Sequence, residues 1–282
     1  MDIKSIGVLG SGIMGSGIAH VSALAGFQTK LYDIADDILN RAHSQIQANL
    51  QKGVELKKLT IEQVEFALSH LSLTKSLEEV AQCDFLIEAV PELIDLKLKL
   101  YGELDRLSPQ HTIFASNTSG LSITEIAAAT KRPKKFIGMH FFNPVHKMKL
   151  IEIIKGLETD GETFGITEWV GQKMGKETVA VRESPGFVTS RINALIGNEA
   201  FYMLEEGIAS AADIDKALKL GLNHPMGPFE MVDLVGLDTR LSILNYLHQT
   251  LGEKYRPCPL LVKYVKAGRL GRKVGKGVYE YR

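Results

Sequence analysis

The sequence predicts an α/β fold in which a mostly parallel sheet with an inserted helical hairpin is followed by a smaller all-helical domain. Early in the chain, short apolar runs alternate with amphipathic helical patterns, as they do in βαβ units. Residues 36–69 interrupt this alternation with two successive helical patterns. Pro185 and Gly186 then mark a boundary, and only helical patterns follow them. We therefore expect an α/β domain over residues 1–184 and a helical domain over residues 185–282.

Each predicted element follows from a local pattern. The strands are short apolar runs rich in β-branched and aromatic residues, and they cover residues 5–10, 29–34, 84–90, 112–117, 136–142, 150–155 and 177–184. The two inserted helices are predicted to meet near Gly53. In the second domain, Gly207 is the expected C-cap of the first helix, and the helical patterns cover residues 191–207, 211–220, 228–251 and 257–267.

The composition is that of an ordinary globular protein and narrows the classes of partner. The 282 residues are 45% hydrophobic, and 33 basic residues balance 33 acidic ones. There is therefore no basic excess for nucleic acid or for an anionic membrane surface. Cys83 and Cys258 have neither a metal-ligand spacing nor the number that a disulfide framework needs. We therefore expect no bound metal. The sequence also has no apolar run of membrane-spanning length and no signal-peptide pattern, so we expect a cytoplasmic protein.

Residues 10–15 read G-S-G-I-M-G, a glycine pattern that follows an apolar run and precedes a helical one. In this context the first glycine makes a tight turn, the second lets the backbone approach a pyrophosphate, and the third lets the helix pack on the strand. The N–H groups at the helix N-terminus then favour phosphate. The pattern predicts a Rossmann-type dinucleotide site with contacts from Gly10, Gly12, Ile13, Met14 and Gly15.

The next predicted strand brings Asp33, 18 residues beyond Gly15, to the same site. Its carboxylate can accept hydrogen bonds from both hydroxyls of an adenosine ribose, and it would repel a 2′-phosphate. We therefore predict NAD rather than NADP as the cofactor. A surface aspartate beside a glycine-rich turn is the alternative, but both features fall in the register that a dinucleotide-binding domain requires.

Two further predicted strands end near this site, because ligands of parallel sheets bind beyond the carboxyl ends of the strands. We expect the residues that follow these strands to face the cofactor, although ordinary loop and helix-cap chemistry would also account for each of them. The candidates are Ala89, Val90, Glu92 and Lys97 after one strand, and Asn117 and Ser119 after the other.

A histidine and a glutamate lie in two consecutive apolar runs that are predicted to be strands, namely His140 and Glu152. An unpaired carboxylate is costly to bury, and an imidazole is a natural partner for it. Such a pair fixes the histidine tautomer and leaves the second ring nitrogen as the base that a dehydrogenase needs. A structural buried pair, or no contact at all, is the alternative. His146, in the intervening loop, is expected to be solvated.

Several stretches spread over nearly the whole chain carry a family resemblance. They are VLGSGIMGSGIAH, LIEAVPE, SNTSGLSI, GMHFFNPVHKMKLIEII, the PGF boundary, HPMGPFEMVDLVGLD and GRKVGKGVYEY. With them the sequence resembles the L-3-hydroxyacyl-CoA dehydrogenase family, and more narrowly the bacterial 3-hydroxybutyryl-CoA dehydrogenases. The resemblance implies that an (S)-3-hydroxyacyl-CoA and NAD⁺ interconvert with a 3-oxoacyl-CoA and NADH, as in fatty-acid and butanoate metabolism.

The resemblance also implies residue roles. His140 is the general acid or base and Glu152 its orienting partner, while Ser119 and Asn143 bind the reacting oxygens of the substrate and the nicotinamide end. The helical domain usually forms a homodimer. The positions that match NAD contacts are Asp33, Glu92, Lys97 and Lys273, and those that match the coenzyme A region are Asn49 and Lys52, in a locally basic hairpin.

The helix after PGF departs from the family pattern. The family has asparagine immediately before an arginine, whereas here Ser190 precedes Arg191, and Leu195 stands where a proline is usual. The resemblance implies that this asparagine helps to hold the substrate. A serine is shorter and donates one hydrogen bond rather than two. Ser190 is therefore a substrate-binding candidate that affects affinity, rate or chain-length preference.

Two other protein classes are compatible with a dinucleotide-binding domain. Dehydrogenases of the 3-hydroxyisobutyrate and 6-phosphogluconate type resemble this chain in the first domain but use a lysine base on a helix, which the segment HFFNPVHKMKLIE disfavours. A protein without catalysis, such as an NADH sensor, is the second class. The intact pair of His140 and Glu152 disfavours that reading.

Overall fold

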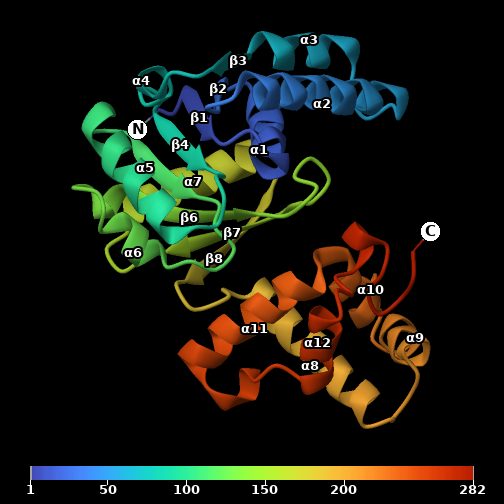
Figure 1. Cartoon of the computed structure of the whole chain (residues 1–282). Coiled ribbons are helices and arrows are strands. Elements are labelled where there is room, and N and C mark those ends of the chain that lie inside the picture. Colours follow the sequence, from blue (N-terminus) through green and yellow to red (C-terminus); the bar gives the residue numbers. More distant parts are fainter. Residues whose placement is uncertain (1, 282) are drawn as a thin grey trace. The chain divides into compact units, whose positions relative to one another are not determined.

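The computed structural model describes residues 2–281. The chain divides into two compact units between Glu183 and Ser184. The first unit is α/β and the second is helical (Figure 1). The predicted fold class is confirmed.

An eight-stranded sheet forms the centre of the first unit, in the order β3-β2-β1-β4-β5-β6-β7-β8. Neighbouring strands are parallel except β6 and β7, which are antiparallel. The chain order reverses between β1 and β4, and ligands of open parallel sheets bind at such a point. The strands are β1 (Ser5–Leu9), β2 (Gln28–Tyr32), β3 (Leu71–Thr74), β4 (Phe85–Glu88), β5 (Ile113–Ser116), β6 (Phe136–Phe141), β7 (Leu150–Lys155) and β8 (Glu177–Arg182).

Helices cover both faces of this sheet (Figure 1). α1 (Ile13–Leu24) and α7 (Gly161–Lys173) pack on one face, in an apolar cluster that includes Ile18 and Val170. α5 (Ile94–Leu107) and α6 (Ile123–Ala127) pack on the other, where the ring of Tyr101 contacts those of Phe114 and Phe136. Because both faces are buried, the central strands are nearly continuous apolar runs.

A helical hairpin is inserted between β2 and β3. It consists of α2 (Asp36–Glu55) and α3 (Ile61–Ser69). The buried residues of α2 are spaced by three or four positions, which gives the helix one apolar stripe; they are Leu39, Ala42, Ile46 and Leu50. The two helices are joined at residues 56–60, close to the predicted position near Gly53, which itself lies in the last turn of α2. The missing side chain there leaves room for Leu59, whose Cδ1 would lie 2.7 Å from a Cβ on Gly53.

Three elements differ from the sequence-based expectation. β3 and the short helix α4 (Leu77–Val80) were not predicted. β3 has four residues that are half-buried or exposed, so it lacks the apolar run of a central strand. The helical pattern over 228–251 is two helices, α10 (Pro228–Val235) and α11 (Leu237–Leu251). Gly236 separates them with φ +104°, a conformation that glycine adopts without strain.

The second unit packs its helices around one apolar core, in which the rings of Phe201 and Phe229 meet edge to face with centroids 5.2 Å apart. Gly207, with φ +73°, follows the first helix in the left-handed conformation of a C-terminal cap. Among residues 2–281, no helix is both long and apolar enough to cross a membrane. Besides α10 and α11, the helices are α8 (Thr189–Glu205), α9 (Ala211–Gly221) and α12 (Pro259–Lys266).

Candidate active site

The loop between β1 and α1 has the geometry of a dinucleotide cradle. Gly10 has φ +93°, and a Cβ on Gly15 would lie 1.7 Å from the Gly10 carbonyl oxygen. A Cβ on Gly12 would meet nothing within 4 Å, so the loop is open at that point. Gly12 is also the N-cap of α1, and no side chain caps this helix. The uncapped N–H groups and the open space at Gly12 fit a pyrophosphate.

Asp33, which follows β2, is tied to the same loop. Its Oδ2 accepts hydrogen bonds from the Ser11 N–H at 2.8 Å and from the Ser11 hydroxyl at 2.9 Å. An ionised carboxylate has about four acceptor sites, so Asp33 retains capacity for ribose hydroxyls. Sequence reasoning did not single out Ser11. The side chain of Ile13 at the start of α1 is exposed and that of Met14 is half-buried.

Ala89 and Val90 leave β4 beside the glycine loop. The Ala89 N–H donates to the Leu9 carbonyl oxygen at 2.7 Å, and a Cβ on Gly10 would lie 2.7 Å from the Ala89 carbonyl oxygen. The close approach of these two backbones is the reason that position 10 requires glycine. The structure therefore brings this predicted pair to the edge of the cradle.

A network of charged and polar side chains, buried at Glu88 and Lys97 and exposed at Glu92 and Ser119, joins the ends of β4 and β5. Lys97, on α5, is 1% exposed, and its Nζ lies 2.5 Å from Glu88 Oε1 and 3.3 Å from Glu92 Oε2. Glu92 Oε1 accepts hydrogen bonds from the Thr118 hydroxyl and, at 2.9 Å, from the Ser119 N–H. Three predicted site residues, Glu92, Lys97 and Ser119, thus belong to one network. Sequence reasoning missed Glu88, although it is a carboxylate in an apolar run just as Glu152 is.

Asn117 links β5 to β6. Its Oδ1 accepts a hydrogen bond from the Phe141 N–H at 2.9 Å, and its own N–H donates to the Glu88 carbonyl oxygen at 2.8 Å. Phe141 directly follows His140, so Asn117 fixes the end of the strand that carries the histidine.

His140 and Glu152 contact each other across β6 and β7. The antiparallel register places the two residues directly opposite, and opposite residues of such a pair project from the same face. His140 Nδ1 lies 2.7 Å from Glu152 Oε2. His140 is 5% exposed and Glu152 is fully buried. The arrangement is a buried imidazole–carboxylate pair at the end of the sheet where the cradle lies.

The loop between β6 and β7 carries Asn143 and is held by Lys176. The Lys176 Nζ donates hydrogen bonds to the carbonyl oxygens of Val145 and, at 2.8 Å, of Met148. Lys176 is largely buried, and burial lowers the pKa of its ammonium. These contacts restrain the chain just after Asn143.

His146, in the same loop, packs on α1. Its ring lies parallel to that of His20, with centroids 5.5 Å apart, so His146 is half-buried rather than solvated. Burial, followed by the nearby charges of His146 and Lys176, lowers the pKa of His20 to about 4. His20 is therefore neutral near neutral pH.

Asn143 and His146 line a cavity of about 510 Å³ whose other walls are the glycine loop and α2. Asn49 lines this cavity, as its predicted role in binding requires, and its Oδ1 accepts a hydrogen bond from Gln45 Nε2 at 3.2 Å. Arg41, one further residue of this wall, was not predicted.

Lys52 lies further along α2 and is not among the lining residues of this cavity. Its Nζ lies 2.7 Å from Glu55 Oε2, since residues three apart on a helix are neighbours. The basic side chain that reaches the cavity is Arg41 instead.

Comparison with known proteins gives the family. Residues 5–184 match the profile of the 3-hydroxyacyl-CoA dehydrogenase NAD-binding domain, and residues 186–281 match that of the 3-hydroxyacyl-CoA dehydrogenase C-terminal domain. The chain belongs to the 3-hydroxyacyl-CoA dehydrogenase family. It is therefore an NAD-dependent dehydrogenase, and the predicted cofactor is confirmed. Membership also sets aside dehydrogenases of the 3-hydroxyisobutyrate and 6-phosphogluconate type.

Several relatives within the 3-hydroxyacyl-CoA dehydrogenase family are similar over nearly their full length. A probable 3-hydroxybutyryl-CoA dehydrogenase of Bacillus subtilis is 48% identical over 100% of this chain and 98% of its own. A 3-hydroxybutyryl-CoA dehydrogenase of Bradyrhizobium diazoefficiens is 47% identical over 99% of this chain and 96% of its own. The crystal structure of an (S)-3-hydroxybutyryl-CoA dehydrogenase from Ralstonia eutropha has a TM-score of 0.97 at 41% identity, with 100% of both chains covered.

Two predicted site residues of this 3-hydroxyacyl-CoA dehydrogenase lie in the helical unit. Ser190 is half-buried in the first turn of α8. The Lys273 Nζ lies 2.7 and 2.6 Å from the two carboxylate oxygens of Asp238, at the start of α11. Both lysine and aspartate remain partly exposed, at 47% and 40%.

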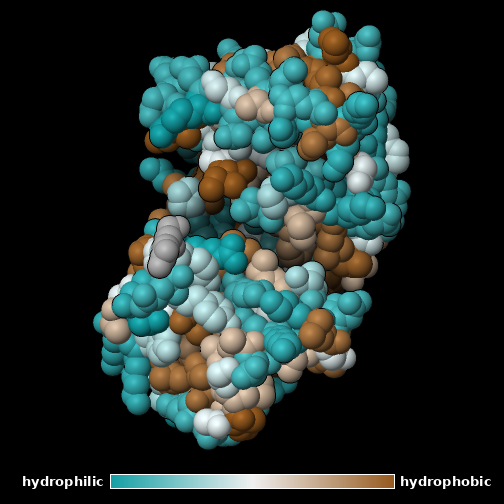
Figure 2. All heavy atoms as spheres, turned by 90° about the vertical axis from the view of Figure 1, so that its right-hand side faces the viewer, coloured by the Kyte–Doolittle hydropathy of each residue, from teal (hydrophilic) through white to brown (hydrophobic). Residues whose placement is uncertain are grey.

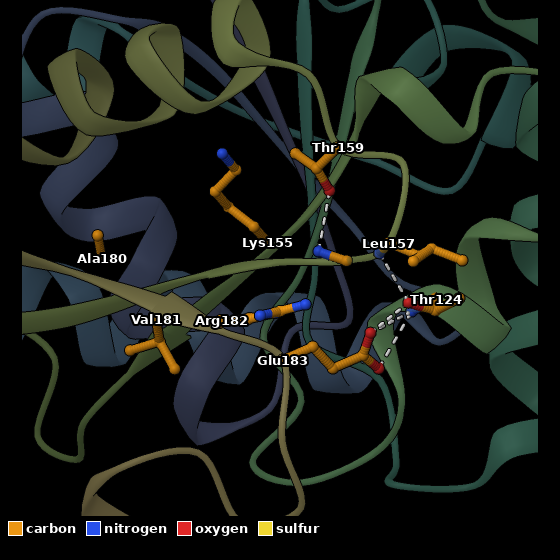
Figure 3. Close-up of a pocket in the computed structure, with 9 residues that line it drawn as sticks. Thr124, Lys155, Leu157, Thr159, Ala180, Val181, Arg182 and Glu183 are labelled. Carbon is orange, nitrogen blue, oxygen red and sulfur yellow. Dashed lines mark hydrogen bonds between the residues drawn. The ribbon is translucent and has the colours of Figure 1, made fainter.

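A larger cavity of about 640 Å³ lies at the ends of β7 and β8. Figure 3 shows that several of its polar groups bond to one another: Glu183 accepts hydrogen bonds from the N–H and hydroxyl of Thr124, and that hydroxyl oxygen accepts one from the Leu157 N–H at 2.9 Å. None of its lining residues belongs to the imidazole–carboxylate pair or to the cradle. This cavity is therefore not the candidate active site.

Proposed function

We propose that the chain interconverts (S)-3-hydroxybutyryl-CoA and acetoacetyl-CoA with NAD, using His140 and Glu152 as an acid/base pair. The observation that supports this most is the 2.7 Å contact between the two buried side chains beside the dinucleotide cradle. The names of the close relatives support the substrate.

Bound NAD supplies the hydride acceptor for oxidation of the hydroxyl carbon. His140 takes the hydroxyl proton at Nε2, because its Nδ1–H is donated to Glu152. The carboxylate holds the ring in that tautomer and stabilises the imidazolium that forms. In the reverse direction His140 returns the proton to the oxygen of the 3-oxo group.

The remaining chain residues bind and orient. Ser119 and Asn143 follow β5 and β6 and hold the reacting oxygen of the substrate and the nicotinamide end of the cofactor. Asp33 accepts from the adenosine ribose, and the glycine loop holds the pyrophosphate. Asn49, with the basic Arg41 on the same wall, holds the polyanionic coenzyme A; Lys52 adds positive charge nearby.

The helical unit completes the enzyme through substrate contacts and a homodimer. Ser190 contributes to the substrate site and Lys273 to the cofactor site, as the family resemblance implies. Apolar side chains reach the surface of this unit (Figure 2), and a dimer interface accounts for such exposure. Those on α9, α10 and the turns beside α9 are Ile208, Leu220, Leu222, Leu234 and Val235. A cytoplasmic location stays a prediction from the sequence.

The purified chain, assayed with acetoacetyl-CoA and NADH, tests this function. We expect NADH oxidation that saturates in both substrates. A chain that binds NADH but oxidises none with 3-oxoacyl-CoA thioesters of any length would be an NADH-binding protein and would refute the proposal.

A further inference from the structure

We propose that Glu88 is a positioning residue of the active site, and that it acts through Lys97 and Glu92 on the loop that carries Ser119. The proposal rests on the function proposed above, because it concerns how that site is held in shape. Lys97 then serves the cofactor site indirectly, through Glu92, rather than as a contact of its own.

One arm of the network runs through charged groups. Glu88 Oε1 accepts hydrogen bonds from the Lys97 ammonium at 2.5 Å and from the Val90 N–H at 2.8 Å. The same ammonium lies 3.3 Å from Glu92 Oε2. Glu92 Oε1 accepts the Ser119 N–H at 2.9 Å. The position of Ser119 therefore depends on Lys97, and that of Lys97 on Glu88.

A second arm starts from the other oxygen of the same carboxylate. Glu88 Oε2 accepts a hydrogen bond from the Ser116 hydroxyl at 2.6 Å. The Ser116 oxygen accepts the Thr118 N–H at 3.3 Å, and the Thr118 hydroxyl donates to Glu92. The two arms meet at Glu92, so one buried carboxylate fixes the loop after β5 from both sides.

The energetics favour a positioning role over a purely structural one. Glu88 is fully buried, which raises the pKa of its carboxyl, while the Lys97 ammonium opposes that shift. Two apolar side chains of similar size would hold β4 and α5 together at least as well. What a hydrogen-bonded ion pair adds is a single geometry for its members. Lys97, 1% exposed, has its ammonium between the carboxylates of Glu88 and Glu92.

Three variants test the first arm: Glu88→Gln, Lys97→Met and the two combined. Each single change leaves one member of the ion pair without its partner. The unfolding midpoint should therefore fall, and kcat/KM for acetoacetyl-CoA should fall by about 10- to 100-fold. The double variant removes both charges and should regain stability, but kcat/KM should stay low because Glu92 has lost its cation. Recovery of kcat/KM together with stability, or wild-type kinetics in Glu88→Gln, overturns the proposal.

Binding of NADH, measured by fluorescence titration without substrate, tests whether Lys97 acts through Glu92. We expect Lys97→Met and Glu92→Gln to weaken NADH binding by the same factor, and their combination to weaken it no further. Additive effects would mean that Lys97 contacts the cofactor itself and would overturn the indirect role.

Asp105→Asn is the matched control. Asp105 lies on the same helix α5 and forms a buried ion pair with Arg132, 2.6 Å apart, that does not reach the loop after β5. It should lower the unfolding midpoint and leave kcat/KM at the wild-type value; an equal loss of kcat/KM there overturns the proposal. Turnover by the wild-type chain decides the proposed function separately, and the NADH titrations test the network even if that turnover is absent.

Discussion

His140 Nδ1 lies 2.7 Å from Glu152 Oε2, and the antiparallel register of β6 and β7 places the two residues directly opposite. Both side chains are buried. A carboxylate in such a place needs a donor, and the imidazole provides one. In the proposed mechanism, the same contact selects the ring nitrogen that exchanges a proton with the substrate. The proposed chemistry and the packing of the sheet edge therefore depend on one hydrogen bond.

Glu152→Gln keeps the shape of the side chain and removes its charge. We expect turnover to fall by less than in a variant that lacks His140, because the imidazole remains but loses orientation and electrostatic support. The pH–rate profile should also shift, since the imidazolium is no longer stabilised. Steady-state kinetics across pH measure both. An unchanged profile with unchanged turnover would mean that the pair plays no part in catalysis.

We expect the preference for NADH over NADPH to depend on Asp33. Its carboxylate repels a 2′-phosphate and loses a ribose donor when NADPH replaces NADH. A hydrogen bond to a charged group contributes about 1.5–3 kcal/mol, so kcat/KM should favour NADH by about 10- to 100-fold. Parallel assays with the two reduced cofactors measure this ratio. Equal values would show that Asp33 serves only the Ser11 turn that it holds in the structure.

Ser190→Asn restores the residue that the family pattern has at this position. We expect a change in acetoacetyl-CoA kinetics of the size of one hydrogen bond, about 0.5–1.5 kcal/mol, and no change in NADH affinity. An increase is expected if water fills the gap beside the serine, and a loss if Asn193, one turn along α8, already supplies an amide. Kinetics that match the wild type would remove Ser190 from the substrate site.

His20 makes the stability of the first unit sensitive to acid. Its pKa falls from 6.5 to about 4 on folding, so the unfolded chain binds the proton first as the pH drops. The contribution of neutral His20 to the free energy of unfolding is fully present above about pH 6.5. It is lost as the pH falls to about 4, by about 3 kcal/mol in all. Urea unfolding should therefore show a shallower acid decline for His20→Gln than for the wild type. Parallel declines in the two proteins would contradict the buried, neutral histidine.

Patterns of apolar residues predicted the centre of the sheet because the central strands β1, β4, β5, β6 and β7 are buried on both faces. Lys155 ends β7 at the position that the pattern LIEIIK predicts. β3 was not predicted, because its half-exposed residues carry no such pattern. The break between α10 and α11 at Gly236 was not predicted, because a glycine inside a helical pattern does not by itself reveal its φ angle.

The candidate site was predictable where one residue type has few possible roles. A glycine loop, a strand-end aspartate and a buried histidine are of this kind. The partner that a charged side chain chooses could not be predicted in the same way. Lys52, for example, pairs with Glu55, three residues away on its own helix. Glu88 carried the same signal as Glu152, a carboxylate in an apolar run, but its lysine partner lies on a helix rather than on a neighbouring strand.

Turnover by His140→Ala, compared with its NADH affinity, tests the central claim most directly. General acid–base catalysis typically contributes about 10²–10⁴-fold, so kcat with acetoacetyl-CoA should fall by that order while the dissociation constant for NADH stays at the wild-type value. Wild-type turnover in this variant would contradict the assignment of His140 as the acid/base.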